Sequence, residues 1–367
     1  MSVGVKIALV YDYLTQFGGG ERVLKAFCEM FPEAPIFTLI YDERATGGAF
    51  KNKKIYTSFL QKIPGAKKLF RGFIWLMPLA IEQFDLSDFN LVISVSHSFG
   101  KGIITKPKTK HICYCLTPTR YLWHDAGLPF KPVSQFLLTY LRAWDYQAAQ
   151  RPDYFIADSE NVRQRIKKYY NRESKVIYPP LWRLETGGEK LEVEYKNYFL
   201  MVGRMVPYKR FDIAIEAFKR LPEEKLLIIG DGPGRKKLEV RNKKLGAKNI
   251  RFLGKVSDSE LAKYYAGSKA LIFPQEEDFG IVPLEAMASG RSVIAYRAGG
   301  ALETVIEGET GEFFSEQTPE SLMRKVQSFD EKKFNPQKIR EYSFKYDKVE
   351  FKNKIQNFLS HLHNYKK

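Results

Sequence analysis

The sequence predicts two α/β domains, each built on an open and mostly parallel β-sheet. Short apolar runs alternate with helical patterns along most of the chain, as they do in successive βαβ units. The length of 367 residues is enough for two domains that each bury a core. The alternation stops at Pro179-Pro180 and the polar segment 185–196, which is typical of a linker. We therefore expect domains at residues 1–180 and 181–345, followed by a C-terminal segment at 346–367.

The first half begins with the apolar run VKIALVY, which predicts a strand over residues 5–10. No basic segment or small-residue cleavage site accompanies this run, so we do not interpret it as a signal peptide. A Gly-rich turn then leads to a helix that begins near Glu21. Four further strands are predicted at 91–95, 111–115, 153–157 and 175–178.

The second half repeats this alternation after the linker. Strands are predicted at 198–203, 225–230, 250–254, 270–274 and 292–296, and helices around 210–220, 234–245 and 258–266. The last segment, 346–367, has the apolar spacing of an amphipathic helix, which we expect to pack back toward the first domain. Ligands of open α/β sheets gather at the carboxyl ends of the strands, so residues that follow a strand are the candidates for a site.

The charge of the chain limits its partners. It carries 59 Lys and Arg against 42 Asp and Glu, a formal net charge of +17. An apolar content of 44% excludes a disordered polycation. Nucleic acid, anionic lipid and phosphorylated ligands are therefore the partners to consider. The three cysteines show no paired spacing, which fits a reducing compartment, and no apolar run approaches the ~20 residues of a spanning helix.

Three consecutive glycines, Gly18, Gly19 and Gly20, lie between the first strand and the first helix. Glycine lets backbone NH groups approach an anion closely, and a helix N-terminus favours negative charge. A tight turn would need the same residues. Phosphate contact and a simple turn are therefore both open at this position.

Two cations, Arg204 and Lys209, flank a proline turn directly after the strand at 198–203. Arginine can donate to two phosphate oxygens at once, whereas lysine supplies a compact point charge. Most surface cations are simply solvated. The position of this pair at the end of a strand favours a phosphate site instead.

Two glutamates lie in the segment that follows the strand at 270–274. Pro283 suits the first turn of a helix, which would place Glu285 in that turn and Glu277 in the preceding loop. Both carboxylates would then face the strand end and could bind sugar or ribose hydroxyls, while the helix N-terminus holds a phosphate. A capping glutamate and a solvated loop acid would explain each residue alone, but they explain the whole segment poorly.

Further segments accompany these three in a characteristic order: G-G-G-E-R-V (18–23), S-H-S-F-G-K-G (96–102), T-P-T-R-Y-L-W (117–123), A-D-S-E-N-V (157–162), V-I-Y-P-P (176–180), E-x-F-G-x-x-x-x-E (277–285), A-M-A-S-G (286–290), A-G-G-x-x-E-T-V (298–305) and G-E-T-G (308–311). Together they resemble glycosyltransferase family 4 along essentially the whole chain, with O-antigen-type mannosyltransferases most similar. The resemblance implies the GT-B fold, in which two Rossmann-like domains face each other across a cleft.

The implied activity is transfer of a hexose with retention, most readily mannose from GDP-mannose, to a saccharide or lipid-linked saccharide in polysaccharide or O-antigen-type assembly. The resemblance implies no cofactor besides the nucleotide-sugar donor, and no metal. A leaving-phosphate oxygen could itself take the acceptor proton. The sequence contains no D-x-D string, and His361 and His363 have no partner ligands nearby in the chain.

The same resemblance implies a role for each site residue. Gly19 and Gly20 would contact the diphosphate from the first domain, and Arg204 and Lys209 would neutralise it from the second. Glu277 would bind the donor sugar, and Glu285 the ribose. The remaining assignments are Phe279, Gly280, Ile281 and Val282 beside the sugar, Lys255 and Val256 at the base, Arg120 and Tyr121 on the acceptor side, and His97 as a catalytic candidate together with Glu277, Arg204 and Lys209.

One position departs from the pattern of these mannosyltransferases. They usually read H-T-P-M-R where this chain has Leu116-Thr117-Pro118-Thr119-Arg120, so a histidine near the donor sugar is missing. An inactive or altered member of the family is therefore one alternative, and a GT-B epimerase is another. A non-enzymatic binder of nucleic acid or of an anionic surface is a third, motivated by the net charge of +17.

Residues 51–80 contain seven cations and no acid, interleaved with bulky apolar side chains such as Phe59, Phe73 and Trp75. This composition suits an interfacial segment on anionic lipid. A pair of buried helices with solvated lysines is the alternative. We expect a cytoplasmic protein that lies on the inner face of the membrane through residues 51–80.

Overall fold

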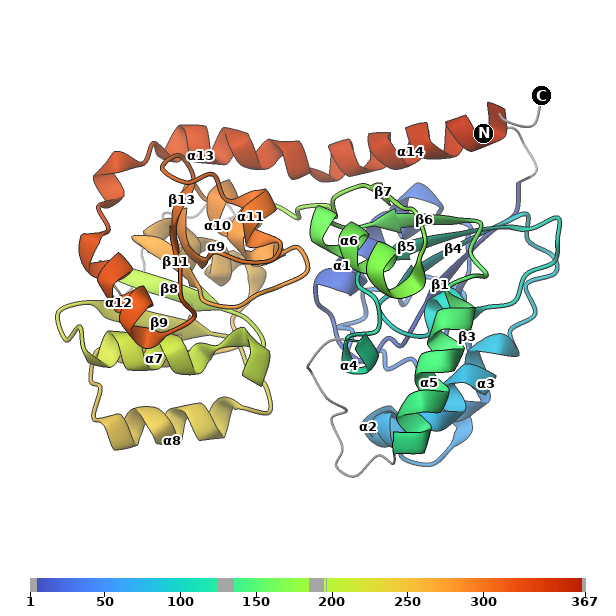
Figure 1. Cartoon of the computed structure of the whole chain (residues 1–367), viewed down its shortest axis with the longest axis horizontal. Coiled ribbons are helices and arrows are strands. Elements are labelled where there is room, and N and C mark those ends of the chain that lie inside the picture. Colours follow the sequence, from blue (N-terminus) through green and yellow to red (C-terminus); the bar gives the residue numbers. More distant parts are fainter. Residues whose placement is uncertain (1–4, 124–134, 185–194, 196, 365–367) are drawn as a thin grey trace. The chain divides into compact units, whose positions relative to one another are not determined.

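The computed structural model describes residues 5–123, 135–184, 195 and 197–364. The chain divides into two compact units (Figure 1). The first runs to Pro180 and resumes at Phe351, and the second spans Leu181–Glu350. The expected linker at 185–196 lies almost entirely outside the described residues.

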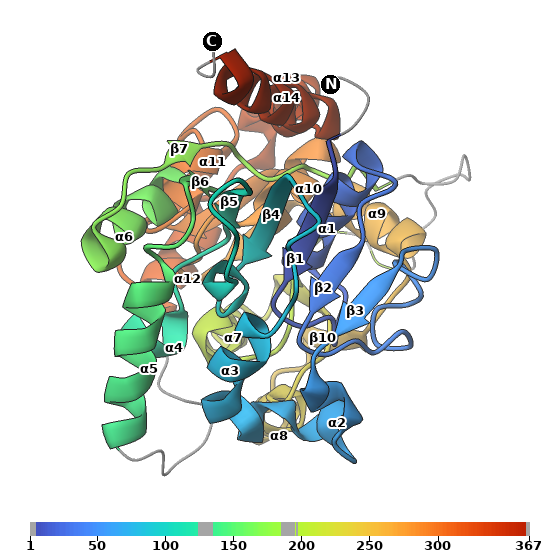
Figure 2. The same ribbon diagram turned by 90° about the vertical axis from the view of Figure 1, so that its right-hand side faces the viewer.

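The first unit contains a seven-stranded parallel sheet of order β3-β2-β1-β4-β5-β6-β7. Figure 2 shows its strands β5, β4, β1, β2 and β3 side by side. The strands are β1 (Ile7–Tyr11), β2 (Ile36–Thr38), β3 (Ile55–Thr57), β4 (Leu91–Ser96), β5 (Lys110–Cys115), β6 (Tyr154–Ala157) and β7 (Lys175–Val176). Every residue of β4 is buried, which explains its continuous apolar run, because helices and loops cover both faces of a parallel sheet.

Helical segments of this unit are α1 (Gly19–Met30), η1 (Phe59–Lys62), α2 (Ala66–Leu69), η2 (Phe70–Leu76), α3 (Met77–Glu82), η3 (Gly100–Gly102), α4 (Arg120–Trp123), α5 (Gln135–Ala148) and α6 (Glu160–Tyr170). The expected first helix begins two residues before Glu21 because Gly18 forms its N-cap, and the Gly18 NH donates to the Glu21 carboxylate at 2.8 Å. One core cluster joins β1 and β4 to the short helices of residues 59–82. A second lies under α6.

The second unit contains a six-stranded parallel sheet of order β10-β9-β8-β11-β12-β13. Its strands are β8 (Tyr198–Val202), β9 (Lys225–Ile229), β10 (Ile250–Gly254), β11 (Ala270–Phe273), β12 (Ser292–Tyr296) and β13 (Gly311–Phe314). Its helical segments are η4 (Pro207–Lys209), α7 (Phe211–Lys219), α8 (Arg235–Leu245), α9 (Asp258–Gly267), α10 (Ile281–Ala288), α11 (Ala301–Thr304), α12 (Pro319–Ser328), η5 (Glu331–Lys333), α13 (Pro336–Ser343) and η6 (Phe344–Tyr346). The predicted alternation of strands and helices is therefore present in both units.

The C-terminal helix α14 (Lys348–Asn364) joins the first unit from Phe351 onward. The ring of Phe351 packs against Phe27 and Tyr114, and the ring of Phe358 against Tyr154. Lys352 also forms an ion pair of 2.8 Å with Glu29 on α1. These contacts bury the apolar face of α14 on the first unit.

Three strands have no counterpart among the sequence expectations. These are β2, β3 and β13, with three or four residues each. A run of this length is too short to show a period, so only its pairing partner identifies it as a strand. Within the described residues, no helix is long and apolar enough to cross a membrane.

Candidate functional site

The connections of the second sheet change direction between β8 and β11, because β9 lies on one side of β8 and β11 on the other. Ligands of open α/β sheets bind in the crevice at the carboxyl ends of two such strands. Arg204 and Lys209 follow β8, and Glu277 follows β11. The structure thus brings three of the residues selected from the sequence to one switch point.

Lys209 and Glu277 form an ion pair across this switch point. Their side chains are only 11% and 15% exposed, so the pair is largely removed from water. The side-chain amide of Gln275 lies 3.5 Å from the same Glu277 oxygen. A cation in this position can neutralise either the carboxylate or an anionic ligand, and Arg204 adds an exposed second cation on the same loop.

Glycines allow the loops around this pair to touch. A Cβ at Gly230 would overlap the carbonyl oxygen of Gly203, and one at Gly232 would stand 2.7 Å from the Met205 nitrogen. The Met205 NH donates to the Asp231 carbonyl at 2.9 Å. The loop that carries Arg204 is therefore held in place by close backbone contact with the loop after β9.

The loop that carries Glu277 is held in a similar way by the segment A-G-G (298–300). The Gly300 NH donates to the Glu277 carbonyl at 2.9 Å, and a Cβ at Gly300 would overlap Phe279. Gly280, with φ of +91°, forms the N-cap of α10. A left-handed backbone at this point favours glycine. The glycines of both motifs thus shape the loop before α10.

Helix α10 begins with the half-buried Ile281 and Val282, and Glu285 follows in its second turn. The Glu285 carboxylate is buried and accepts a hydrogen bond of 2.9 Å from the Tyr265 hydroxyl. The ring of Phe279 is also buried and packs against Tyr346 with ring centres 5.7 Å apart. The expectation that Glu285 lies in the first turn is therefore wrong, because the helix begins at Ile281, two residues before Pro283, and Phe279 lies in the loop just before its N-cap.

Lys255 and Val256 lie between β10 and the capping residue of α9, Ser257. Lys255 is exposed and Val256 half-buried. They share the carboxyl edge of the sheet with the ion pair, but β9 lies between their strand and β8. A ligand that reaches both must therefore extend along this edge.

The first sheet has its own switch point, between β1 and β4, and a second ion pair lies there. Asp12 follows β1, and its carboxylate is 2.7 Å from Nδ1 of His97, which follows β4. Burial of Asp12 would raise its pKa, but His97 outweighs that effect and lowers the pKa to about 2. Burial would likewise lower the pKa of His97, and Asp12 raises it above the usual 6.5. Each group therefore favours the charged form of the other.

The Gly18–Gly20 turn lies beside this pair. Gly19 is exposed, as an anion contact would need, whereas a Cβ at Gly20 would stand 2.6 Å from the Tyr11 hydroxyl and 2.8 Å from Cδ1 of Leu116. Packing alone thus explains Gly20. The side chain of Leu116, the position at which the sequence departs from the expected pattern, contributes to that packing.

On the expected acceptor side, Arg120 and Tyr121 form the start of α4, and both are half-buried. The Tyr121 hydroxyl is 2.5 Å from Oγ of Ser98. Beneath them lies a buried ion pair of 2.6 Å between Lys101 and Asp145. This pair connects the loop after β4 to α5.

Asp12, Glu21, Lys101 and Asp145 are polar residues whose importance sequence reasoning missed. Asp145 also accepts a hydrogen bond from the Thr119 hydroxyl at Oδ1. Its Oδ2 accepts from the Trp123 indole NH and from the Tyr170 hydroxyl. A lone acid among the aromatic residues of α5 was the available signal for Asp145. Among the described residues, no group of three or more His, Cys, Asp or Glu side chains could hold a metal ion.

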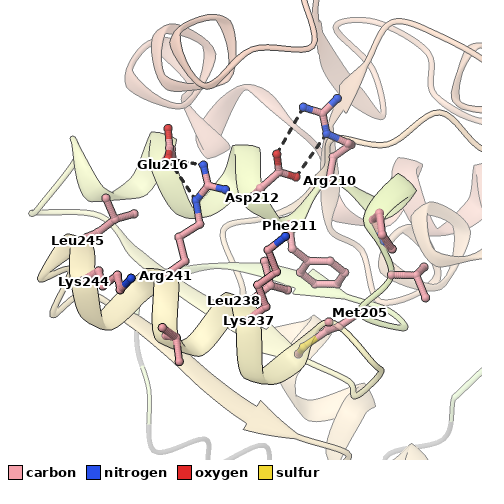
Figure 3. A pocket seen from close by; sticks show the side chains of 14 residues that line it. Met205, Arg210, Phe211, Asp212, Glu216, Lys237, Leu238, Arg241, Lys244 and Leu245 are labelled. Atoms are coloured by element: carbon pink, nitrogen blue, oxygen red, sulfur yellow. Dashed lines mark hydrogen bonds and ion pairs between the residues drawn. The ribbon is translucent and has the colours of Figure 1, made fainter.

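A cavity of about 710 Å³ lies between α7 and α8 (Figure 3). Met205, Phe211 and Leu238 line it with apolar atoms, and Arg241 pairs with Glu216 across it at 2.5 Å. None of the site residues selected from the sequence lines this cavity, although its wall includes the Met205–Pro207 part of the loop that carries Arg204.

Comparison with known proteins finds similarity mainly in the second unit. Residues 183–346, somewhat less than half of the chain, match the family described as Glycosyl transferases group 1. An O-antigen chain mannosyltransferase of Salmonella typhimurium is 31% identical over 178 residues, which are 47% of this chain and 50% of that protein. A GDP-mannose-dependent phosphatidylinositol monomannoside mannosyltransferase of Mycolicibacterium smegmatis is 36% identical over 123 residues, or 30% of this chain and 32% of that protein.

The chain spans about half the length, or less, of the curated relatives that it matches. Solved structures match over nearly its full length. The Anabaena protein HepE, in complex with UDP and glucose, has a TM-score of 0.71 and 18% identity and covers 98% of this chain and 100% of its own. At this identity the likeness establishes the fold alone. The predicted fold class is confirmed: two parallel-sheet α/β domains, as in GT-B glycosyltransferases.

Proposed function

We propose that the protein is a retaining glycosyltransferase that moves a hexose from a nucleotide-diphosphate sugar to a saccharide or lipid-linked saccharide acceptor in polysaccharide or O-antigen-type assembly. The observation that carries this proposal is the Lys209–Glu277 pair at the switch point of the sheet whose residues match the glycosyltransferase family. Mannose and GDP-mannose are the first choices, since two relatives are named mannosyltransferases. HepE was solved with UDP and glucose, so the base must be tested.

In this proposal Lys209 moves from the Glu277 carboxylate to the diphosphate when the donor binds, and Arg204 supplies the second charge. Glu277 is then available to a sugar hydroxyl, with residues 279–282 beside it. Glu285 binds the ribose while Tyr265 orients its carboxylate, and the main chain at Lys255-Val256 meets the base. Gly19 approaches the diphosphate from the first unit.

The reaction breaks the bond between the sugar and the diphosphate and develops negative charge on the leaving phosphate. Preorganised cations and helix N-termini stabilise such charge. Two basic side chains serve this purpose, so we propose a metal-independent reaction with no other cofactor. A leaving-phosphate oxygen takes the proton of the acceptor hydroxyl, which bonds to the anomeric carbon on the face that the diphosphate leaves.

A donor panel tests this proposal. GDP-, UDP- and ADP-sugars are added at saturation, and thermal unfolding and nucleotide release are measured. We expect stabilisation by one base class, and release of the nucleoside diphosphate only when an acceptor is added. Lys209→Met should abolish the stabilisation, whereas Lys237→Met, an exposed lysine of α8, should retain it.

Absence of any response would refute the activity. Conversion of the nucleotide sugar without transfer would instead favour an epimerase. Robust transfer by the native chain would exclude inactivity caused by Leu116.

We also propose that the enzyme works in the cytoplasm, on the inner face of an anionic membrane, through residues 51–80. Three large apolar side chains of this segment are strongly exposed: Leu69 at 65%, Trp75 at 52% and Leu79 at 60%. Lys67 and Lys68 are exposed beside them. Exposed apolar side chains flanked by cations suit the boundary between lipid headgroups and acyl chains.

Residues 51–80 also lie close to His97 at the carboxyl edge of the first sheet. Phe70 is buried and packs on Tyr13 with ring centres 4.7 Å apart, and the Tyr13 hydroxyl lies 3.2 Å from Nε2 of His97. A membrane bound at Leu69 and Trp75 would therefore lie close to the carboxyl edge of the first sheet. This location suits an acceptor that is anchored in lipid.

Vesicle flotation tests this surface. We expect binding to vesicles that contain phosphatidylglycerol and not to pure phosphatidylcholine. Each cation near an anionic surface contributes about 1 kcal/mol, so the double variant K67E/K68E should bind at least about tenfold more weakly. The double variant K236E/K237E on exposed positions of α8 is the matched control. Equal losses in both variants would show that net charge, and not this surface, drives the binding.

A further inference from the structure

Gln275 is a buried glutamine beside the Lys209–Glu277 ion pair, two residues after the end of β11. It is 1% exposed. Among the residues that the structure describes, none donates a hydrogen bond to its amide oxygen, Oε1. A buried acceptor without a donor destabilises the folded protein, so this glutamine calls for an explanation other than packing.

The nitrogen end of the same amide has only a weak contact. Nε2 lies 3.5 Å from Oε1 of Glu277, which is the outer limit of a hydrogen bond. Because a carboxylate accepts and cannot donate, the NH2 group is the end of the amide that faces Glu277. The unpaired oxygen of Gln275 therefore faces away from that carboxylate.

Gln317 shows how a structural glutamine is bound in this part of the unit. Its Nε2 donates to the Pro274 carbonyl at 2.9 Å, and its Oε1 accepts from the Arg210 guanidinium at 2.7 Å. Both ends of that amide are thus paired with protein groups. The contact at Pro274 also fixes the backbone directly before Gln275, so the unpaired oxygen lies on an anchored segment.

The chemistry of an amide oxygen limits the ligand group that can pair with it. It is a neutral acceptor, so its partner must donate a hydrogen bond. The oxygens of a diphosphate are acceptors and do not meet this requirement. In the proposed function the ribose lies at Glu285 and the base at Lys255-Val256, whereas the sugar lies beside Glu277. A hydroxyl of that sugar is therefore the donor that suits Gln275.

Donor binding would also open space next to this amide. Lys209 contacts the same oxygen of Glu277 that the Gln275 NH2 group faces. In the proposed function the Lys209 ammonium leaves that oxygen for the diphosphate. The NH2 group of Gln275 then remains as a donor to the Glu277 carboxylate, and the volume left by the ammonium becomes available to a sugar hydroxyl.

We propose that Gln275 is a specificity-determining residue for the donor, whose Oε1 accepts a hydrogen bond from one hydroxyl of the transferred sugar. This inference rests on the proposed function. A donor that lacks this hydroxyl would leave the buried oxygen unpaired and would bind more weakly. Gln275 would thus select among sugars that differ at one hydroxyl.

A calorimetric binding cycle tests the inference. The native protein and Gln275→Met are titrated with GDP-mannose, with UDP-glucose, and with analogues of each that lack one hydroxyl of the sugar. Methionine has nearly the shape of glutamine but cannot accept this hydrogen bond. In the native protein, loss of one particular hydroxyl should weaken binding roughly ten- to a hundredfold. In Gln275→Met that factor should shrink by about fivefold or more.

Gln317→Met is the matched control, because it removes a second amide whose two ends are bound by protein groups. It should leave the factor for each hydroxyl at its native value. If a donor binds but every factor is the same in the native protein and in Gln275→Met, the inference is wrong and the proposed function stands. If neither donor binds the native protein, the proposed function fails and this inference falls with it.

Thermal unfolding without ligand gives a second test that needs no donor. Gln275→Met removes an unpaired buried oxygen, so its Tm should equal or exceed the native value. Gln317→Met breaks two hydrogen bonds and should unfold at a lower temperature. A loss in Gln275→Met as large as that in Gln317→Met would show that Gln275 serves the fold, and it would overturn the inference whether or not a donor binds.

Discussion

Gly300→Ala is a small substitution that should damage the donor loop, and the structure gives the reason. Gly300 has an ordinary right-handed backbone, with φ of −63°, so its conformation does not require glycine. Space does. A methyl group would stand 2.5 Å from the carbonyl carbon of Phe279, whereas ordinary contact begins at 3.4 Å. The A-G-G segment and the loop of Glu277 would therefore have to separate by about 1 Å.

Two costs follow from that separation. Overpacking of this kind costs about 1–3 kcal/mol, and the hydrogen bond from Gly300 to the Glu277 carbonyl, worth about 1 kcal/mol, would be broken. A domain of this size loses roughly 2–4 °C in Tm for each kcal/mol. The unfolding transition of the second unit should therefore fall by roughly 4–16 °C. Displacement of Glu277 by about 1 Å should lower kcat/KM by roughly tenfold to a hundredfold.

Scanning calorimetry and donor kinetics measure the two effects. Gly72→Ala is the control, since a Cβ there meets nothing within 4 Å and the backbone is not left-handed. It should leave both quantities unchanged. If Gly300→Ala melts and turns over like the native protein, then A-G-G does not shape the donor loop and this reasoning is wrong.

Three further predictions concern the first unit. The pair of Asp12 and His97 should stabilise the fold most between about pH 4 and 6.5. The contribution of Asp12 is lost as pH falls toward its folded pKa of about 2. The contribution of His97 is lost as pH rises through its raised pKa. Denaturant titration across pH should show this maximum, and Asp12→Asn should flatten it. Asp145→Ala removes the carboxylate that pairs with the buried Lys101. It should lower the free energy of unfolding by about 3–5 kcal/mol in the same assay. A loss below about 1 kcal/mol would show that the Lys101–Asp145 ion pair does not stabilise the first unit. Gly20→Ala should lower the free energy of unfolding by about 1–3 kcal/mol, because the added methyl group would overlap Tyr11 and Leu116. Leu116→Ala in the same chain should restore part of that loss. If it restores none, Leu116 does not contact this turn.

The fold was largely predictable because its signals are local. A buried parallel strand such as β4 must be apolar along its whole length, and the alternation with helices implies the sheet. The three short strands β2, β3 and β13 could not be found, since their identity depends on their neighbours. The C-terminal helix was visible from its spacing, but its docking on Phe27 and Tyr114 was not.

The site was predictable in its parts and not in its pairings. Glu277 and Lys209 were each found at a strand end, but only the strand order brings residues 68 positions apart into contact. Asp12 follows β1 as a single acid, and nothing near it in the chain indicates that its partner lies after β4. Buried acids of this kind become visible only when the sheet order is known.

The most direct test of the account is a calorimetric titration of the native protein and of Lys209→Met with GDP and UDP, each beside its monophosphate. The account predicts one site that binds one nucleoside diphosphate more tightly than the monophosphate. Lys209→Met should lose about tenfold or more of that affinity and bind the monophosphate nearly as before. Equal affinities for diphosphate and monophosphate in the native protein, or no effect of Lys209→Met, would contradict it.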